Sequence, residues 1–115
     1  MSFLAFGINH KTASVELREK VAFDLQKIND ALVSLSSLEK VSEGVILSTC
    51  NRTEIYCSGD DDLDSSDLLA WLESFHTLDR RSLQAVTFTL KGEKAIEHVM
   101  SVAGGFVSLV RGAAQ

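Results

Sequence analysis

Apolar runs of strand length recur along this chain and divide it into segments. Residues 3–8 are apolar at almost every position, which predicts a central strand covered on both faces. The β-branched run 45–49 is typical of a buried strand, and residues 53–57 resume a similar composition after a polar break, so we expect a hairpin. Apolar and polar residues alternate over 86–90, which predicts a further strand.

Helices are expected between the strands. A short helical piece follows Ser14, and a longer helix begins with Asp24 as its N-cap. The apolar residues of this longer helix recur at helical spacing and should face the core: Leu25, Ile28, Leu32 and Leu35. Asp64 begins another helix in the same way, and its expected apolar face consists of Leu68, Leu72 and Phe75.

A final helix is expected from about Glu93. The apolar residues expected to share one face of it are Ile96, Val99, Met100 and Ala103. The resulting order, β-α-β-β-α-β-α, matches the split βαβ arrangement. We therefore predict one α+β domain over residues 1–115, with a ferredoxin-like antiparallel sheet and helices packed on one face.

Composition and charge narrow the function classes. The chain has 115 residues, of which 45% are apolar, and this is enough for a hydrophobic core. Its net charge of −5 disfavours a protein that coats nucleic acid. Its apolar runs are far shorter than the roughly 20 residues that span a bilayer. Two cysteines and three histidines without zinc-motif spacing predict no metal site. We expect a cytoplasmic domain with no membrane partner.

Cys50 is the first candidate for chemistry. It lies at the end of an apolar strand, and the neighbouring Arg52 offers the positive charge that favours a reactive thiolate. Simple packing of a small side chain is the competing interpretation. Cys57, inside the next strand, is interpreted as a packing residue.

Histidines supply the second group of candidates. His98 lies nearly opposite the expected apolar face of the last helix, so it faces either solvent or a cleft. His10 falls in a polar turn, where a structural role is the simpler interpretation. His76 follows a helix and suggests a charge partner for the helix C-terminus.

Three segments together are similar to a known family. They are 7–13 (Gly-Ile-Asn-His-Lys-Thr-Ala), 47–56 (Leu-Ser-Thr-Cys-Asn-Arg-Thr-Glu-Ile-Tyr) and 95–103 (Ala-Ile-Glu-His-Val-Met-Ser-Val-Ala). In this combination and at this spacing, they resemble the N-terminal catalytic domain of glutamyl-tRNA reductase, and the similarity spans essentially the whole chain.

The resemblance implies an activity. The family reduces the activated carboxyl of glutamate on its tRNA to glutamate-1-semialdehyde, the first committed step towards 5-aminolevulinate and tetrapyrroles. A cysteine forms a thioester, releasing tRNA, and NADPH then donates hydride. Full-length members are homodimers and continue into an NADPH-binding domain and a dimerising domain, so this chain is expected to be the catalytic domain alone, with glutamyl-tRNA as its partner.

By match to the family motifs, Cys50 would be the nucleophile and His98 would support it. Arg52 would hold the glutamyl group, and the other implied substrate-binding residues are Thr49, Ser108 and Gln115. The chain departs from the family at Ser14, where proline is usual, and near its end. There, the family has polar or rigid residues that line the pocket, and this chain has Val107, Ala113 and Ala114 in their place.

Two other functions remain open at this stage. A non-catalytic ferredoxin-like module that binds a ligand or a protein would leave Cys50 incidental. A free-standing thiol hydrolase would use Cys50 and His98 on simple esters.

Overall fold

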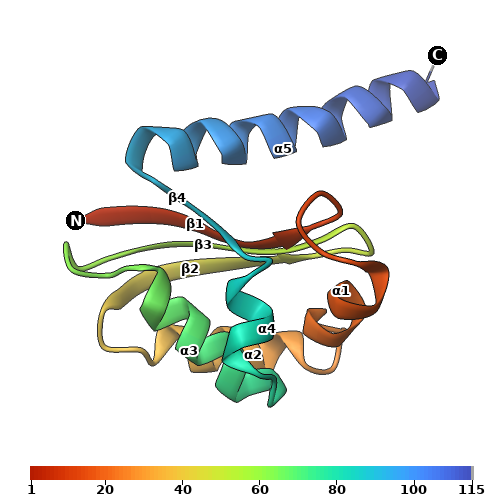
Figure 1. Cartoon of the computed structure of the whole chain (residues 1–115). Helices are drawn as coiled ribbons and strands as arrows, with labels where there is room; N and C mark the ends of the chain where they lie inside the picture. The colour runs from red at the N-terminus through yellow and green to blue at the C-terminus, as the bar shows by residue number, and fades with distance from the viewer. Residues whose placement is uncertain (115) are drawn as a thin grey trace.

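Four strands form one antiparallel sheet in the order β2-β3-β1-β4 (Figure 1). The computed structural model describes the backbone of residues 1–114 and the side chains as far as Gly104. The strands are β1 (Ser2–Asn9), β2 (Val41–Ser48), β3 (Arg52–Gly59) and β4 (Phe88–Lys91). This strand order is that of the split βαβ arrangement, so the predicted α+β class and antiparallel sheet are confirmed.

Helices cover both faces of the sheet, so the prediction that they pack on one face alone is wrong. Those beneath it in Figure 1 are α1 (Val15–Val21), α2 (Ile28–Ser36), α3 (Ser65–His76) and α4 (Arg80–Gln84), whereas α5 (Gly92–Ala114) crosses the opposite face. The larger core lies on the side of α1–α4 and contains the fully buried Leu4, Phe6 and Ile8. The alternate residue Ala5 is buried with Ala95 of α5. The central strand is therefore covered on both faces, as the run 3–8 predicts.

The helix expected from Asp24 begins later than predicted. The side chain of Asp24 accepts the amide protons of Gln26 and Lys27, at 3.0 and 2.8 Å, but this closes a turn, and α2 starts only at Ile28. Leu25 lies in that turn and is 91% exposed. The prediction that Leu25 faces the core is therefore wrong, because helical periodicity does not hold across the turn.

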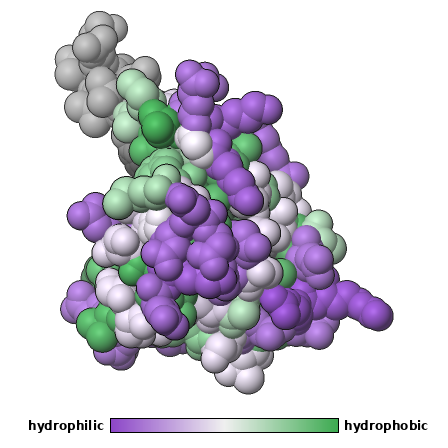
Figure 2. Space-filling view, turned by 90° about the vertical axis from the view of Figure 1, so that its left-hand side faces the viewer, coloured by the Kyte–Doolittle hydropathy of each residue, from purple (hydrophilic) through white to green (hydrophobic). Residues whose placement is uncertain are grey.

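The apolar face predicted for the last helix is only partly correct, because Val99 packs against the sheet but Ile96 and Met100 do not. Ile96 and Met100 are 50% and 68% exposed, whereas Ala95 is fully buried against the sheet. A small side chain allows α5 to approach the strands closely, and this contact turns the face that carries His98 towards the sheet. Apolar residues gather in the upper part of Figure 2, at the level of α5, above a largely hydrophilic surface.

The remaining helices follow local capping signals. Asp64 caps α3 in a capping box with Asp67, as the sequence predicts for its start. Helix α4, capped by Asp79, is too short for periodicity to reveal and was not predicted. None of the described helices is both long enough and apolar enough to traverse a bilayer.

Candidate active site

Two loops meet at one end of the sheet. Asn9 and Arg52 are paired across β1 and β3, so the turn after β1 and the hairpin turn before β3 lie together (Figure 1). These loops carry the two motifs at 7–13 and 47–56. Antiparallel pairing thus joins segments that are about forty residues apart in the chain.

The hairpin turn presents Cys50. The backbone amide of Thr49 donates to the carbonyl of Arg52 at 2.8 Å, which closes the turn. The Thr49 hydroxyl accepts the amide protons of Asn51 and Arg52, at 3.2 and 3.3 Å. Cys50 lies within this braced turn and is exposed. Thr49 therefore has a demonstrable structural role in addition to the substrate contact that the family motif implies.

The turn after β1 is held by its own side chains. Asn9 accepts the amide proton of Lys11 through its side-chain oxygen at 2.9 Å, and the Thr12 hydroxyl accepts the Asn9 amide proton at 3.0 Å. This arrangement is the turn predicted for the segment, and it directs His10 and Lys11 to the rim of a cleft.

That cleft has a volume of about 670 Å³. The two turns and one face of α5 line it: Asn9, His10, Lys11, Thr49, Cys50, Asn51, Arg52, His98, Ser101 and Val102. Among the described residues, the lining includes the cations of Lys11 and Arg52 and no carboxylate. Such a surface favours an anionic group beside the thiol of Cys50.

Glu54 lies buried beneath the cleft, and its carboxylate is fully enclosed. Arg52 donates from Nη1 to Oε2 at 2.9 Å, and the Tyr56 hydroxyl donates to Oε1 at 2.7 Å. Nε2 of His98 lies 2.5 Å from the same Oε1. Arg52 and His98, which line the cleft from different elements, are therefore joined through one buried carboxylate.

Small residues make this junction possible. Ala5 and Ala95 are both fully buried where α5 meets the sheet. Gly7 pairs with Glu54 on one side and with Phe88 on the other, and a Cβ on Gly7 would come within 2.2 Å of the Thr53 carbonyl oxygen. The absence of side-chain bulk under α5 allows His98 to reach the strand that carries Glu54.

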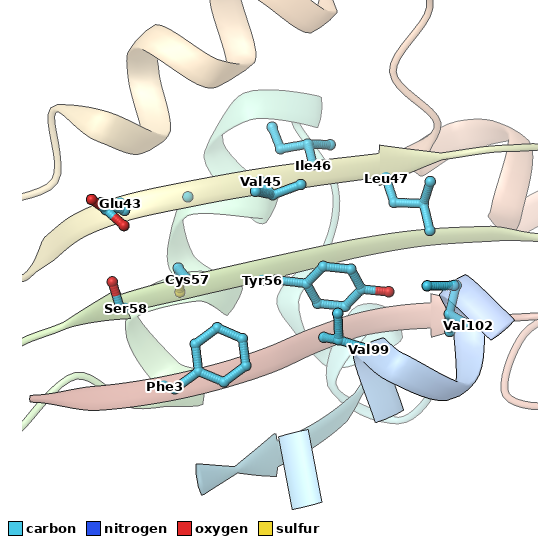
Figure 3. Close-up of a pocket in the computed structure, with 12 residues that line it drawn as sticks. Phe3, Glu43, Val45, Ile46, Leu47, Tyr56, Cys57, Ser58, Val99 and Val102 are labelled. Carbon is cyan, nitrogen blue, oxygen red and sulfur yellow. The ribbon is translucent and has the colours of Figure 1, made fainter. Parts of the chain in front are cut away.

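The second cysteine occupies a different environment. Cys57 is buried, and burial raises the pKa of its thiol to about 11. It borders an apolar groove of about 790 Å³ between α5 and strands β2 and β3, where Tyr56 and Val99 lie together (Figure 3). This groove is larger than the cleft at Cys50, but its only cysteine is protonated at neutral pH. The interpretation of Cys57 as a packing residue is consistent with this environment.

The structure brings four of the predicted site residues together. Cys50, Arg52, Thr49 and His98 line one cleft, which answers the open question of whether His98 faces solvent or a cleft. The side chains of Ser108 and Gln115 lie outside the described residues, as do the substituted positions Val107, Ala113 and Ala114. Those parts of the predicted pocket stay predictions.

Glu54 was not among the site residues predicted from the sequence, and the role predicted for His76 differs from its environment in the fold. The signal for Glu54 was the alternation of Arg52, Glu54 and Tyr56, which places three polar side chains on one face of a strand that is otherwise buried. The ring of His76 packs at a tilt against that of Phe23, with 4.6 Å between the ring centroids, and burial lowers the pKa of His76. The expected cationic partner for the helix end is therefore wrong.

Among the described residues, no group of three or more histidine, cysteine or acidic side chains could hold a metal ion. The bonds that organise the cleft are hydrogen bonds and one ion pair, between Arg52 and Glu54. What the site can do chemically follows from an exposed thiol, an imidazole and a guanidinium.

Comparisons with known proteins agree on one family. Residues 6–115 match the family described as "Glutamyl-tRNAGlu reductase, N-terminal domain". The chain is 50% identical over its full length to the glutamyl-tRNA reductase of Shewanella baltica and 49% identical to that of another Shewanella strain, covering 27% of each protein. The solved structure of the glutamyl-tRNA reductase from Methanopyrus kandleri aligns with this chain at a TM-score of 0.59 and 30% sequence identity. The alignment covers 90% of this chain and 22% of the Methanopyrus kandleri chain.

Proposed function

The chain belongs to the family of N-terminal domains of glutamyl-tRNA reductases, and on that premise we propose that it transfers glutamate from glutamyl-tRNA to the thiol of Cys50. It spans about a quarter of the length of its curated relatives, so the activity is proposed here for the domain. The observation that carries the proposal is the exposed Cys50, held on a braced turn in a cationic cleft with Arg52 and His98.

The proposed step is acyl transfer. The sulfur of Cys50 attacks the ester carbonyl of the glutamyl group, a carbon–sulfur bond forms, and the carbon–oxygen bond to the terminal ribose breaks. The thiol proton passes to His98 and then to the departing ribose oxygen, so the free hydroxyl of the tRNA is restored. The products are a glutamyl thioester on Cys50 and uncharged tRNA.

Recognition of the glutamyl group is assigned to Arg52. Its Nη1 is engaged by Glu54, and a guanidinium has further N–H groups in a planar fork that suits a carboxylate. Arg52 lines the cleft together with Lys11, which adds a second positive charge near the same space. The family motif adds Thr49, Ser108 and Gln115 as proposed substrate-binding residues.

NADPH is the reductant that the family uses, and it supplies hydride when bound. The described residues form an antiparallel sheet, without the glycine-rich turn between a parallel strand and a helix that holds a dinucleotide. They do not fit this cofactor, so we assign only the acyl-transfer half of the reaction to them. With this chain alone, we expect no NADPH-dependent glutamate-1-semialdehyde.

Three further proposals rest on the family resemblance. They are that residues 1–115 act as the catalytic domain, that the full-length protein is a homodimer, and that it works in the cytoplasm in tetrapyrrole biosynthesis. The cationic lining of the cleft is consistent with glutamyl-tRNA as the partner.

The test is the intact mass of the protein after incubation with glutamyl-tRNA. We expect one glutamyl adduct on the parent and on Cys57→Ser, and none on Cys50→Ser. A parent without adduct would favour the non-catalytic binding module. Turnover of simple esters without preference for glutamyl-tRNA would instead indicate a thiol hydrolase.

A further inference from the structure

We propose that Glu54 is a positioning residue that fixes the tautomer of His98 and the direction of Arg52, a role that rests on the proposed acyl transfer. Its carboxylate is completely buried. Burying a charge is unfavourable unless partners compensate for the lost water, so such a group in a small domain calls for an explanation. Here the compensation comes from three side chains, two of which line the cleft.

The hydrogen bonds define which atom of His98 carries a proton. An ionised carboxylate only accepts hydrogen bonds, so the contact between Oε1 of Glu54 and Nε2 of His98 requires a proton on Nε2. In the neutral ring, Nδ1 then keeps its lone pair. No other hydrogen bond to this ring occurs among the described residues. Nδ1 is therefore the nitrogen that we assign to accept the proton of Cys50.

Tyr56 supports the same protonation pattern. Burial, together with the hydrogen bond to Glu54, raises the pKa of its hydroxyl well above the usual value. The phenol keeps its proton and donates to Oε1 at neutral pH. The shared oxygen thus receives two donors, which is the arrangement expected of a carboxylate that acts only as an acceptor.

The other carboxylate oxygen of Glu54, Oε2, holds Arg52 in place. Its Nη1 donates to Oε2 of Glu54, and its side chain is 22% exposed, towards the cleft. One edge of the guanidinium is therefore held in place, and no described side chain engages its other N–H groups, which we assign to a ligand. A single carboxylate can in this way set the positions of both the arginine and the histidine.

The variant Glu54→Gln separates this role from simple packing. Arg52 can only donate, so the amide oxygen must stay on its side and the amide NH₂ must face His98 and Tyr56. The Tyr56 hydroxyl can accept a hydrogen bond from this NH₂ group. The His98 ring can accept one at Nε2 only if its own proton moves to Nδ1. The expected result is a change of tautomer with the fold retained.

The tautomer is measured by NMR on the chain labelled with ¹⁵N-histidine, at mildly alkaline pH where imidazole is neutral. His98→Gln assigns the signals. We expect the proton on Nε2 in the parent and in the matched control Tyr56→Phe, which removes one donor but keeps the carboxylate. We expect it on Nδ1 in Glu54→Gln. A parent ring protonated on Nδ1, or a folded Glu54→Gln with Nε2 still protonated, would overturn the proposal.

Adduct formation gives the second readout. Glu54→Gln should acquire glutamate from glutamyl-tRNA on the order of tenfold more slowly or worse, because His98 presents the wrong nitrogen. An unchanged rate in this folded variant would contradict the positioning role. If Glu54→Gln does not fold, the parent spectrum still decides between Nε2 and Nδ1. Absence of adduct on the parent would instead defeat the acyl-transfer proposal, whatever the tautomer of His98.

Discussion

Asn9 and Arg52 are paired across the two central strands, and this one contact joins the two turns that build the cleft. One turn ends β1, and the other precedes β3. Because neighbouring strands are antiparallel, the two turns lie at the same end of the sheet. The residues proposed for chemistry are therefore positioned by the most buried part of the fold.

The two cysteines should react at very different rates. Cys50 is exposed, whereas Cys57 is buried and its thiol pKa is raised from 9.0 to about 11. That shift alone makes the Cys57 thiolate about 100-fold rarer at neutral pH. Peptide mass spectrometry after brief iodoacetamide treatment should find the label on Cys50.

Unfolding the chain in urea is the control, because it exposes both thiols. The two labelling rates should then approach each other. Equal labelling of Cys57 and Cys50 in the folded chain would show that burial does not protect the second thiol.

Arg52→Lys should impair glutamate capture although the charge is kept. A lysine can pair with Glu54 but cannot also offer a planar fork to a substrate carboxylate. Loss of a charge-assisted hydrogen bond predicts adduct formation slower on the order of 10- to 100-fold. Labelling of Cys50 by iodoacetamide, which has no carboxylate, should change little. Equal loss in both assays would place Arg52 in activation of the thiol instead.

Two glycines should respond oppositely to alanine. A Cβ on Gly7 would lie 2.2 Å from the Thr53 carbonyl oxygen and 2.7 Å from Cα of Glu54, both in backbone that cannot easily yield. Gly7→Ala should destabilise the fold by about 1–3 kcal/mol or more, through overpacking. A Cβ on Gly104 in α5 would meet no described atom within 4 Å beyond its own helix, so Gly104→Ala should stabilise the fold by up to about 1 kcal/mol.

Urea unfolding of both variants measures these differences. The effect of Gly7→Ala should also reach the site, because Gly7 is the strand partner of Glu54. An unchanged midpoint for Gly7→Ala would mean that β1 and β3 can separate at this position without loss of stability.

The sheet could be predicted from sequence because strand signals are local. Runs such as 3–8 and 45–49 are apolar enough to identify strands, and the capping residue Asp64 marks the start of α3. Their order then determined the topology. The face of α5 that meets the sheet could not be predicted in this way. Ile96 and Met100 have the spacing of core residues, yet both are exposed.

For the site, too, local features could be predicted from the sequence and long-range contacts could not. Cys50 and Arg52 were found from a short motif, since they share one turn. The link from His98 to Glu54 spans 44 residues and depends on how closely α5 approaches the sheet. No local pattern reveals a contact between residues so far apart in the chain, so the link between His98 and Glu54 could be found only in the folded chain.

Acid should weaken the fold through His76. Its ring packs against Phe23 and Phe75, and burial, reinforced by the charge of Lys27, lowers its pKa below the usual 6.5. As the pH falls from about 6.5 through the lowered pKa, the unfolded chain binds a proton that the folded chain resists, so the free energy of unfolding decreases. His76→Phe keeps an aromatic ring and removes the titration, so it should lose less stability between pH 7 and pH 5 than the parent. His10→Phe, which alters an exposed histidine, should follow the parent, and the same loss in all three would show that His76 does not control this pH dependence.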